Sequence, residues 1–249
     1  KLDRDVNEGD RKLEPVALDG VELAKVLPEV LRHPTVASKS FLITIGDRAV
    51  GGLTHRDQMV GPWQVPVSDV AVTALSFLSN KGEAMAIGER SPIAVINAPA
   101  SCRMAFAEAI TNIAAADIEL PTVKFSANWM ASCGSEGEDA KLYDAVKATS
   151  EFCIALGVSI SVGKDSCSMK TGWETESGEK RSVTSPVSMI ASASGPVRDI
   201  RRTLTPQLRP NVASKLIAID LSEGRERLGG SVLARVIPSF WDVAPGMGS

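Results

Sequence analysis

Aromatic residues are scarce in this sequence, at 4% of 249 residues, and positive charge is not in excess. The formal net charge is −3 and the sequence pI is about 5.6. Proteins that bind DNA or RNA usually carry a basic surface, and those that bind single strands also use aromatic side chains that stack on bases. The composition therefore predicts no nucleic acid among the partners.

Long apolar runs are also missing. No run of apolar residues approaches the roughly 18–20 that cross a bilayer. The first ten residues are mostly charged or polar and contain no apolar segment of the kind found in signal peptides. We therefore expect no contact with a membrane and a cytoplasmic location.

Cysteine and histidine are too few and too scattered for metal-binding or thiol chemistry. No two cysteines form a C-x-x-C pair, no zinc-ligand spacing occurs, and no cysteine lies in a G-x-C-x-G turn. The chain therefore lacks the Cys-His-Glu set of a glutaminase, and its cysteines are expected to be reduced and mostly buried. These residues are Cys102, Cys133, Cys153, Cys167, His33 and His55.

Strands and helices alternate along the middle of the chain. Asn97 can cap a helix over residues 98–116, and Pro99 suits its first turn. A second, amphipathic helix is predicted over residues 138–156, where Gly157 is placed to end it. Strands are predicted before and after these helices, near residues 82–96, 122–130, 158–162 and 187–194.

The ends of the chain give weaker patterns. Residues 21–31 indicate a short helix interrupted at Pro28, and residues 41–54 indicate two strands joined through Gly46 and Asp47. After about Pro196 we expect a linker, then a strand over residues 215–221 and the beginning of a helix over 228–236.

These patterns divide the chain into three parts. Residues 1–33 form a polar lead-in with a short helix, and residues 34–196 form the main domain. Residues 197–249 form a linker and the start of a second, truncated domain. Alternation of strands and helices indicates an α/β or α+β fold, and periodicity alone does not choose between them.

Three oxygen-bearing side chains stand out from the apolar pattern. Glu108 and Asn112 are four residues apart and share one face of the predicted helix. Asp69 lies in the apolar segment V-P-V-S-D-V-A-V, which is predicted to be a strand. Two carboxylates and a carboxamide form a set of hard oxygen donors suited to Mg²⁺. By spacing alone, however, a Glu/Asn pair four residues apart is more often part of a solvated helix face or of a hydrogen-bonded polar cluster.

Seven segments, taken together and in this order, resemble phosphoribosylformylglycinamidine synthase, the large glutamine-dependent ligase of purine synthesis. The resemblance covers roughly residues 34–236 and is to the second synthetase half of that enzyme. The segments are G-D-R-A-V-G-G-L (46–53), R-D-Q-M-V-G-P-W-Q-V-P-V-S-D-V-A-V (56–72), G-E-A-M-A-I-G-E-R (82–90), A-E-A-I-T-N-I-A (107–114), S-A-N-W-M (126–130), G-E-D-A-K-L-Y-D-A-V (137–146) and V-G-K-D-S-C-S-M-K (162–170).

The resemblance implies a fold like that of aminoimidazole ribonucleotide synthetase. In that family an N-terminal α/β domain joins its sheet to a partner half in a barrel-like interface, and a second α/β domain lies over it. Residues 34–196 would form the first domain, and the residues after 197 would begin the second. The fold class expected is therefore α/β, in its α+β variant.

The resemblance also implies the site residues. Asp69, Glu108 and Asn112 match the positions that hold Mg²⁺ beside a nucleotide, ATP or ADP, in this half. Lys39 matches a lysine that contacts the nucleotide, and Ser68 matches a position that approaches it through its backbone. A further acidic ligand of the family would fall beyond residue 249, so we expect incomplete coordination and weak binding by this chain alone.

The family's reaction converts formylglycinamide ribonucleotide, ATP and glutamine into formylglycinamidine ribonucleotide. The motifs match the half whose nucleotide is an auxiliary, largely structural ligand, so no acid or base catalyst is expected here. The catalytic residues would lie in the other synthetase half and the glutaminase domain, which are the expected partners. This chain should therefore be inactive alone, and its sheet, lacking the partner half, favours a homodimer.

Two other interpretations stay open. The chain could be a stand-alone ATP-dependent enzyme similar to aminoimidazole ribonucleotide synthetase, although it lacks the glycine-rich nucleotide segments and the full second domain. It could also be a non-catalytic structural module whose polar cluster only holds an interface. Nucleotide hydrolysis would distinguish the first, and the absence of Mg-ADP binding the second.

Overall fold

A six-stranded sheet forms the centre of the computed structural model, which describes residues 16–49, 51–222, 224–225 and 227–237. Neighbouring strands are antiparallel except β6 and β7, which are parallel. This mixture of sheet and covering helices confirms the expected α/β fold. In spatial order the strands are β1 (Thr54–Arg56), β4 (Val70–Ala74), β5 (Gly82–Glu89), β10 (Ser188–Val197), β6 (Lys124–Met130) and β7 (Ser159–Ser166).

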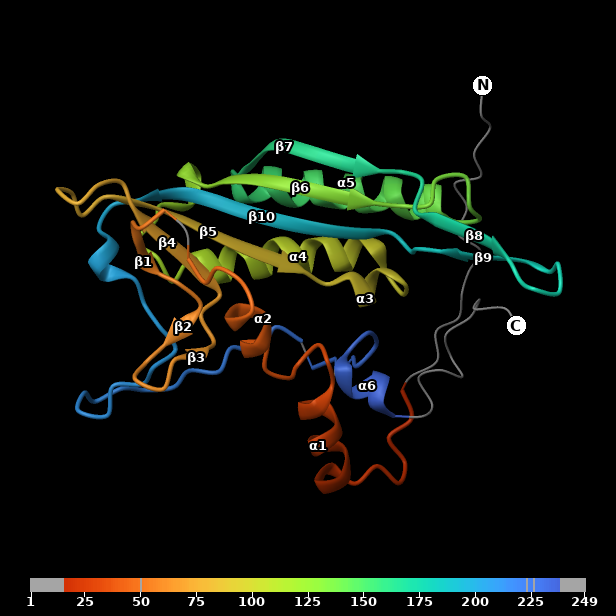
Figure 1. The fold of residues 1–249 in the computed structure, drawn as a ribbon, viewed down its shortest axis with the longest axis horizontal. Helices are drawn as coiled ribbons and strands as arrows, with labels where there is room; N and C mark the ends of the chain where they lie inside the picture. The colour runs from red at the N-terminus through yellow and green to blue at the C-terminus, as the bar shows by residue number, and fades with distance from the viewer. Residues whose placement is uncertain (1–15, 50, 223, 226, 238–249) are drawn as a thin grey trace.

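Two long helices, α4 (Ala98–Ile113) and α5 (Glu138–Leu156), lie along the sheet (Figure 1). Helix α4 connects β5 to β6, and α5 connects β6 to β7. Both begin and end close to where the sequence predicts. The Asn97 side chain accepts a hydrogen bond from the Ala100 N–H at 2.8 Å, and Gly157 ends α5 with a φ of 67°.

The face of the sheet that α4 and α5 cover is built from small side chains. Strand β5 alternates buried and exposed residues along its whole length, and its buried members are glycines and alanines. A Cβ added at Gly88 would lie 2.0 Å from the carbonyl oxygen of Ala105, so only glycine lets α4 come this close. Larger side chains fill the space beside this contact, where the rings of Phe106 and Phe125 are 5.0 Å apart.

The opposite face of the sheet, here called the open face, has no such cover among the described residues. It carries Ala71 on β4, Met85 and Ile87 on β5, Ser194 on β10 and Val162 on β7. Met85, Ile87 and Val162 expose 58–62% of their surface, whereas the alanines of the covered face are almost fully buried. The sheet therefore has one completed hydrophobic face and one exposed face.

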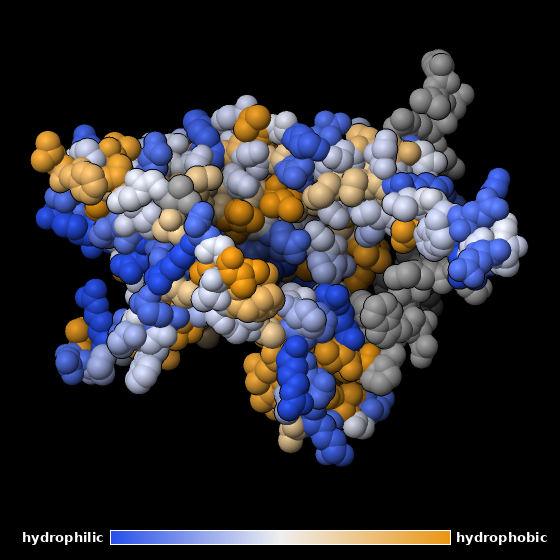
Figure 2. All heavy atoms as spheres, in the orientation of Figure 1, coloured by the Kyte–Doolittle hydropathy of each residue, from blue (hydrophilic) through white to orange (hydrophobic). Residues whose placement is uncertain are grey.

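Short elements surround the sheet. Figure 1 shows α1 and α6 side by side, away from the sheet, and Figure 2 shows hydrophobic side chains gathered on this lobe. The exposed leucines of α1 (Leu23, Leu27 and Leu31) contribute to that surface. The elements are α1 (Leu23–Arg32), α2 (Ser40–Thr44), β2 (Met59–Val60), β3 (Val65–Pro66), α3 (Ser91–Ala94), η1 (Leu120–Thr122), β8 (Lys170–Glu174), β9 (Lys180–Thr184), η2 (Ile200–Arg202) and α6 (Val232–Val236).

The prediction of two strands over residues 41–54 is wrong. Helix α2 occupies Ser40–Thr44, and only Thr54–Arg56 (β1) joins the sheet. The run F-L-I-T-I is too short for periodicity to distinguish a strand from a helical turn. Asp69, predicted to lie within a strand, instead immediately precedes β4.

Three further predictions near the ends are corrected. Helix α1 continues through Pro28, because an exposed helix can leave the freed carbonyl to water. Residues 215–221 form no strand; Leu216 and Ile217 are more than 80% exposed and gain no ladder of hydrogen bonds. The predicted helix near 228 begins at Val232, and residues 1–15 of the lead-in lie outside the described residues.

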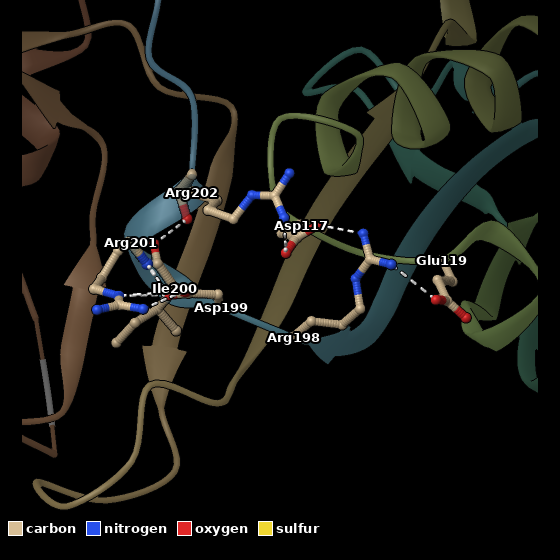
Figure 3. A network of polar contacts seen from close by, with 8 residues as sticks. Asp117, Glu119, Arg198, Asp199, Ile200, Arg201 and Arg202 are labelled. Carbon is tan, nitrogen blue, oxygen red and sulfur yellow. Dashed lines mark hydrogen bonds and ion pairs between the residues drawn. The ribbon is translucent and has the colours of Figure 1, made fainter.

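A polar network fastens the end of β10 to the turn after α4 (Figure 3). Arg198 forms ion pairs with Asp117 at 2.5 Å and Glu119 at 2.9 Å. Arg201 binds the Asp199 side chain at 2.6 Å, and these hydrogen bonds lower the pKa of the Asp199 carboxyl to about 2. Arg202 pairs with the other oxygen of Asp117 at 3.6 Å, so three arginines face three carboxylates and the network is balanced in charge. It fixes the path of the chain leaving the sheet.

The described helices give no membrane-spanning candidate. Each is either too short or too polar to cross a bilayer.

Candidate functional site

Strand β5 is longer than its neighbour β4, and the candidate site lies where β5 extends beyond β4. Val70, the first residue of β4, pairs with Ala86, so β5 continues past the start of β4 through Ile87 and Glu89. Those residues keep their pairing with β10 on the other side. On the β4 side, their backbone groups need partners from elsewhere, because buried or half-buried N–H and C=O groups are rarely left unpaired.

Helix α4 supplies these partners through the two polar residues that the sequence singles out. Glu108 Oε2 accepts a hydrogen bond from the Glu89 N–H at 2.9 Å. One helical turn later, Asn112 Nδ2 donates to the Ile87 carbonyl oxygen at 3.0 Å. Two side chains one turn apart on α4 therefore bond two backbone groups two residues apart on β5. Both side chains brace the edge of β5 where β4 is absent.

Glu108 and Asn112 differ in whether an oxygen atom is left without a hydrogen bond or ion pair among the described residues. The carboxylate of Glu108 uses its other oxygen, Oε1, in an ion pair with Arg90 Nη2 at 2.8 Å. The amide of Asn112 donates its nitrogen to a carbonyl, an arrangement that leaves Oδ1 as the group able to bind something else. Among the described residues no hydrogen bond to this Oδ1 is present.

A cavity of about 330 Å³ lies beside Asn112, at the start of β4. Asp69 lines it with an exposed carboxylate that forms no ion pair or hydrogen bond within the described part of the chain. Glu108 does not line the cavity. The lining residues are Gln58, Ser68, Asp69, Val70, Ala71, Met85, Ala86, Ile87, Asn112 and Ser192.

Ser68 also belongs to this cavity. Its backbone N–H donates to the Gln58 carbonyl oxygen at 3.2 Å, and its hydroxyl donates to the Val70 carbonyl oxygen at 3.2 Å. Lys39 is placed elsewhere, just before α2, where its ammonium group donates to the Ala37 carbonyl oxygen. The structure thus brings Ser68, Asp69 and Asn112 to one cavity, holds Glu108 next to it by Arg90, and leaves Lys39 outside it.

The donor set suits a hard cation in its chemistry. Asp69 offers a carboxylate and Asn112 an amide oxygen on one cavity, and Mg²⁺ often uses only one or two protein carboxylates together with water and phosphate oxygens. No three His, Cys, Asp or Glu side chains gather as a metal cluster in the described ranges. A protein-only cage is therefore not built here, whereas a cation shared with a phosphate ligand fits these residues.

The structure gives three of the four thiols a raised pKa. All four cysteines are free, and Cys102 and Cys153 are buried. Burial raises the pKa of Cys102 to about 11, and hydrogen bonds with Asp165 and Cys133 raise the pKa of Cys167 to about 11. At neutral pH these groups stay protonated, so they are poor nucleophiles.

Sequence reasoning missed three residues of this region. Arg90 ends the segment G-E-A-M-A-I-G-E-R, where its place directly after a strand was the available signal. Gln58 and Ser192 line the cavity from a loop and from β10. Neither residue shows its role in the sequence, because only the pairing of β5 with β4 and β10 brings them together.

The comparison with known families gives one match. The sequence profile of the FGAR-AT PurM_N-like domain matches residues 38–196, which is more than half of the chain. The matched region begins before α2 and ends one residue before the end of β10, so it includes all six strands of the sheet except that last residue, and both covering helices.

Several solved structures resemble the chain at low identity. A structure of PurLQS from Thermotoga maritima has 16% identity, covers 69% of this chain and 25% of its own, and gives a TM-score of 0.49. Structures of T. maritima PurL complexed with ADP and with FGAR each have 16% identity and a TM-score of 0.43. Each covers 56% of this chain, and 22% and 21% of its own chain respectively. The chain thus spans about a quarter or less of these proteins.

Proposed function

This chain belongs to the FGAR-AT PurM_N-like domain family, and we propose that it acts as part of the second synthetase half of the large glutamine-dependent phosphoribosylformylglycinamidine synthase. The observation that carries the proposal is the cavity at the start of β4. There Asp69 and Asn112, which are 43 residues apart in the sequence, line the same hollow with oxygen donors.

In this proposal the cavity binds the phosphates of ATP or ADP together with Mg²⁺. Asp69 and Asn112 would hold the cation, and Glu108 would join them from the next turn of α4. The cation would neutralise phosphate charge. Ser68 would approach the nucleotide through its backbone, and Lys39 would reach a phosphate only if the segment before α2 moved from its present place.

The nucleotide is proposed to be auxiliary, so the chain itself contributes binding and support. None of the residues on the cavity is proposed as an acid or base. In the full enzyme, ATP phosphorylates the amide oxygen of formylglycinamide ribonucleotide, and ammonia from glutamine then displaces the phosphate. The other synthetase half and the glutaminase domain would supply that chemistry, and this chain would be inactive by itself in the full reaction.

The proposed partners need a surface, and the open face of the sheet supports their docking. Met85 and Ile87 on β5 and Val162 on β7 expose apolar side chains on the same face of the sheet, where a second sheet could pack. We further propose the division into 1–33, 34–196 and 197–249, with the last part beginning a second α/β domain. In the absence of the other half, two copies of this chain would associate through the same face.

One observation favours a second candidate, a non-catalytic structural module. Glu108 and Asn112 both bond the backbone of β5, and this bracing alone would account for an acid and an amide on a helix face. The free carboxylate of Asp69 is what the structural interpretation leaves unexplained.

Isothermal titration with Mg-ADP distinguishes the two candidates. The nucleotide site predicts measurable binding by the wild-type chain, lost on removal of Mg²⁺ with EDTA and weakened about tenfold or more in Asp69→Asn, because a charged ligand is replaced by a neutral one. Asp144→Asn, an equal charge change on the exposed side of α5, should bind as the wild type does. Absence of binding by the wild type would favour the structural module.

A further inference from the structure

Glu108 is not ready to bind a cation in this structure, because both of its oxygens are occupied. Oε2 accepts from the Glu89 N–H, and Oε1 forms the ion pair with Arg90. Asn112 contrasts with it, since its nitrogen is held by the Ile87 carbonyl and its oxygen is left over. Of the proposed ligands, Glu108 alone must give up a protein partner before it can offer a new bond through Oε1.

Arg90 can leave Glu108 without disturbing the fold. Its backbone carbonyl accepts a hydrogen bond at 2.7 Å from Ser101, a buried residue of α4, and another from the Ile93 N–H at the start of α3. The Arg90 side chain is 46% exposed, and the remaining hydrogen bond of its guanidinium group is a long one, 3.3 Å, to the Glu89 carbonyl oxygen. The main chain is therefore fixed, whereas the side chain can rotate into solvent at small cost.

The hydrogen bond from Glu89 keeps the carboxylate in place during such a change. Because the Glu89 N–H belongs to a strand that is fully paired with β10, Oε2 is tied to the rigid part of the sheet. Loss of Arg90 therefore frees Oε1 alone. The same oxygen cannot favourably serve a guanidinium and a divalent cation at close range, since the two positive groups repel each other.

We propose that Arg90 is the counter-ion of Glu108 in the empty site, and that a divalent cation displaces it from Oε1. This inference rests on the proposed nucleotide site. It adds that Arg90 competes with the cation for Glu108 Oε1. Arg90 keeps the Glu108 carboxylate neutralised while the site is empty, and it lowers the affinity of the site for cations. Arg90 is thus a positioning residue that acts through Glu108.

The test is a titration of the 249-residue chain with Mn²⁺ at a fixed concentration of ADP, because the proposed site shares its cation with a phosphate. Electron paramagnetic resonance separates protein-bound Mn²⁺ from Mn²⁺ that is free or bound to ADP alone. Arg90→Met should bind Mn²⁺ about two- to fivefold more tightly than the wild type, which corresponds to the usual strength of a partly exposed ion pair. Arg90→Lys restores a positive charge and should return the affinity toward that of the wild type. Lys147→Met removes the same charge from an exposed position on α5, which does not line the cavity, and should change the affinity little.

A double-mutant cycle shows whether the effect passes through Glu108. In Glu108→Gln the carboxylate is absent, so adding Arg90→Met should no longer tighten Mn²⁺ binding. Unchanged or weaker binding by Arg90→Met, compared with Lys147→Met, would overturn the displacement. Tightening that persists in Glu108→Gln would overturn the role of Glu108.

The titrations distinguish an error in the proposed nucleotide-metal site from an error in the proposed role of Arg90. If wild type and Asp69→Asn both bind no Mn²⁺, the nucleotide-metal site is wrong, and the displacement is wrong with it. If Asp69→Asn weakens binding but Arg90→Met has no effect, the site stands and only the counter-ion role is lost.

Discussion

The covered and open faces of the same sheet are made from alternate residues of the same strands, yet they differ in the size of their side chains and in how far these are exposed. On the covered face, glycines and alanines allow α4 to approach until no Cβ fits at Gly88. On the open face, Met85 and Ile87 of the same strand stay more than half exposed. The first face holds the domain together, and the second is the face that we propose for partners. The candidate site lies where the two meet, at the edge of β5 beyond β4.

The largest expected difference between the faces is in the cost of removing a side chain. Phe106→Ala should lower the free energy of unfolding by about 3–5 kcal/mol, because Phe106 is fully buried against Phe125 and leaves a cavity. Met85→Ala on the open face should cost about 1 kcal/mol or less. Urea unfolding of both variants checks this, and equal costs would mean that the open face is also packed in solution.

The covered face should also lose stability in alkali, through Cys102. Burial raises the pKa of this thiol from 9.0 to about 11, so the folded protein keeps a proton that the unfolded chain releases. The stabilisation is complete below pH 9, declines as the pH rises, and reaches a loss of roughly 2–3 kcal/mol near pH 11. Urea unfolding at intervals from pH 8 to pH 11 measures the decline.

The matched variant for this experiment is Cys102→Ala. It carries no thiol, so its stability should fall less steeply over the same pH interval, whatever its stability at pH 8. Parallel curves for the two proteins would show that other groups, rather than Cys102, cause the decline.

The smallest expected effect on stability comes from the open face. Val162→Lys should change the free energy of unfolding by no more than about 0.5 kcal/mol, because the side chain is 62% exposed. If two copies associate through this face, light scattering should show a dimer for the wild type and a monomer for Val162→Lys. Tyr143→Lys on α5 should remain dimeric, and a monomeric wild type would refute association.

Much of the main domain could be predicted from the sequence because its signals are local. Asn97 and Gly157 limit the two long helices, and the strands of the sheet have the expected alternation of apolar residues. The segment over 41–54 could not be assigned, since a five-residue apolar run suits a helix and a strand equally. Residues 215–221 have the composition of a strand, but a strand also needs neighbours with which to pair.

The candidate site divides in the same way. The sequence alone determined that Glu108 and Asn112 share one helix face, because a helix places residues four apart together. Only the tertiary structure decided that β5 extends beyond β4 and that α4 braces the edge of β5 left unpaired there. It also decided that Arg90 pairs with Glu108, whereas Asp69 has no ion pair or hydrogen bond among the described residues. Those facts depend on strand register and on contacts between distant segments, which no local pattern of residues encodes.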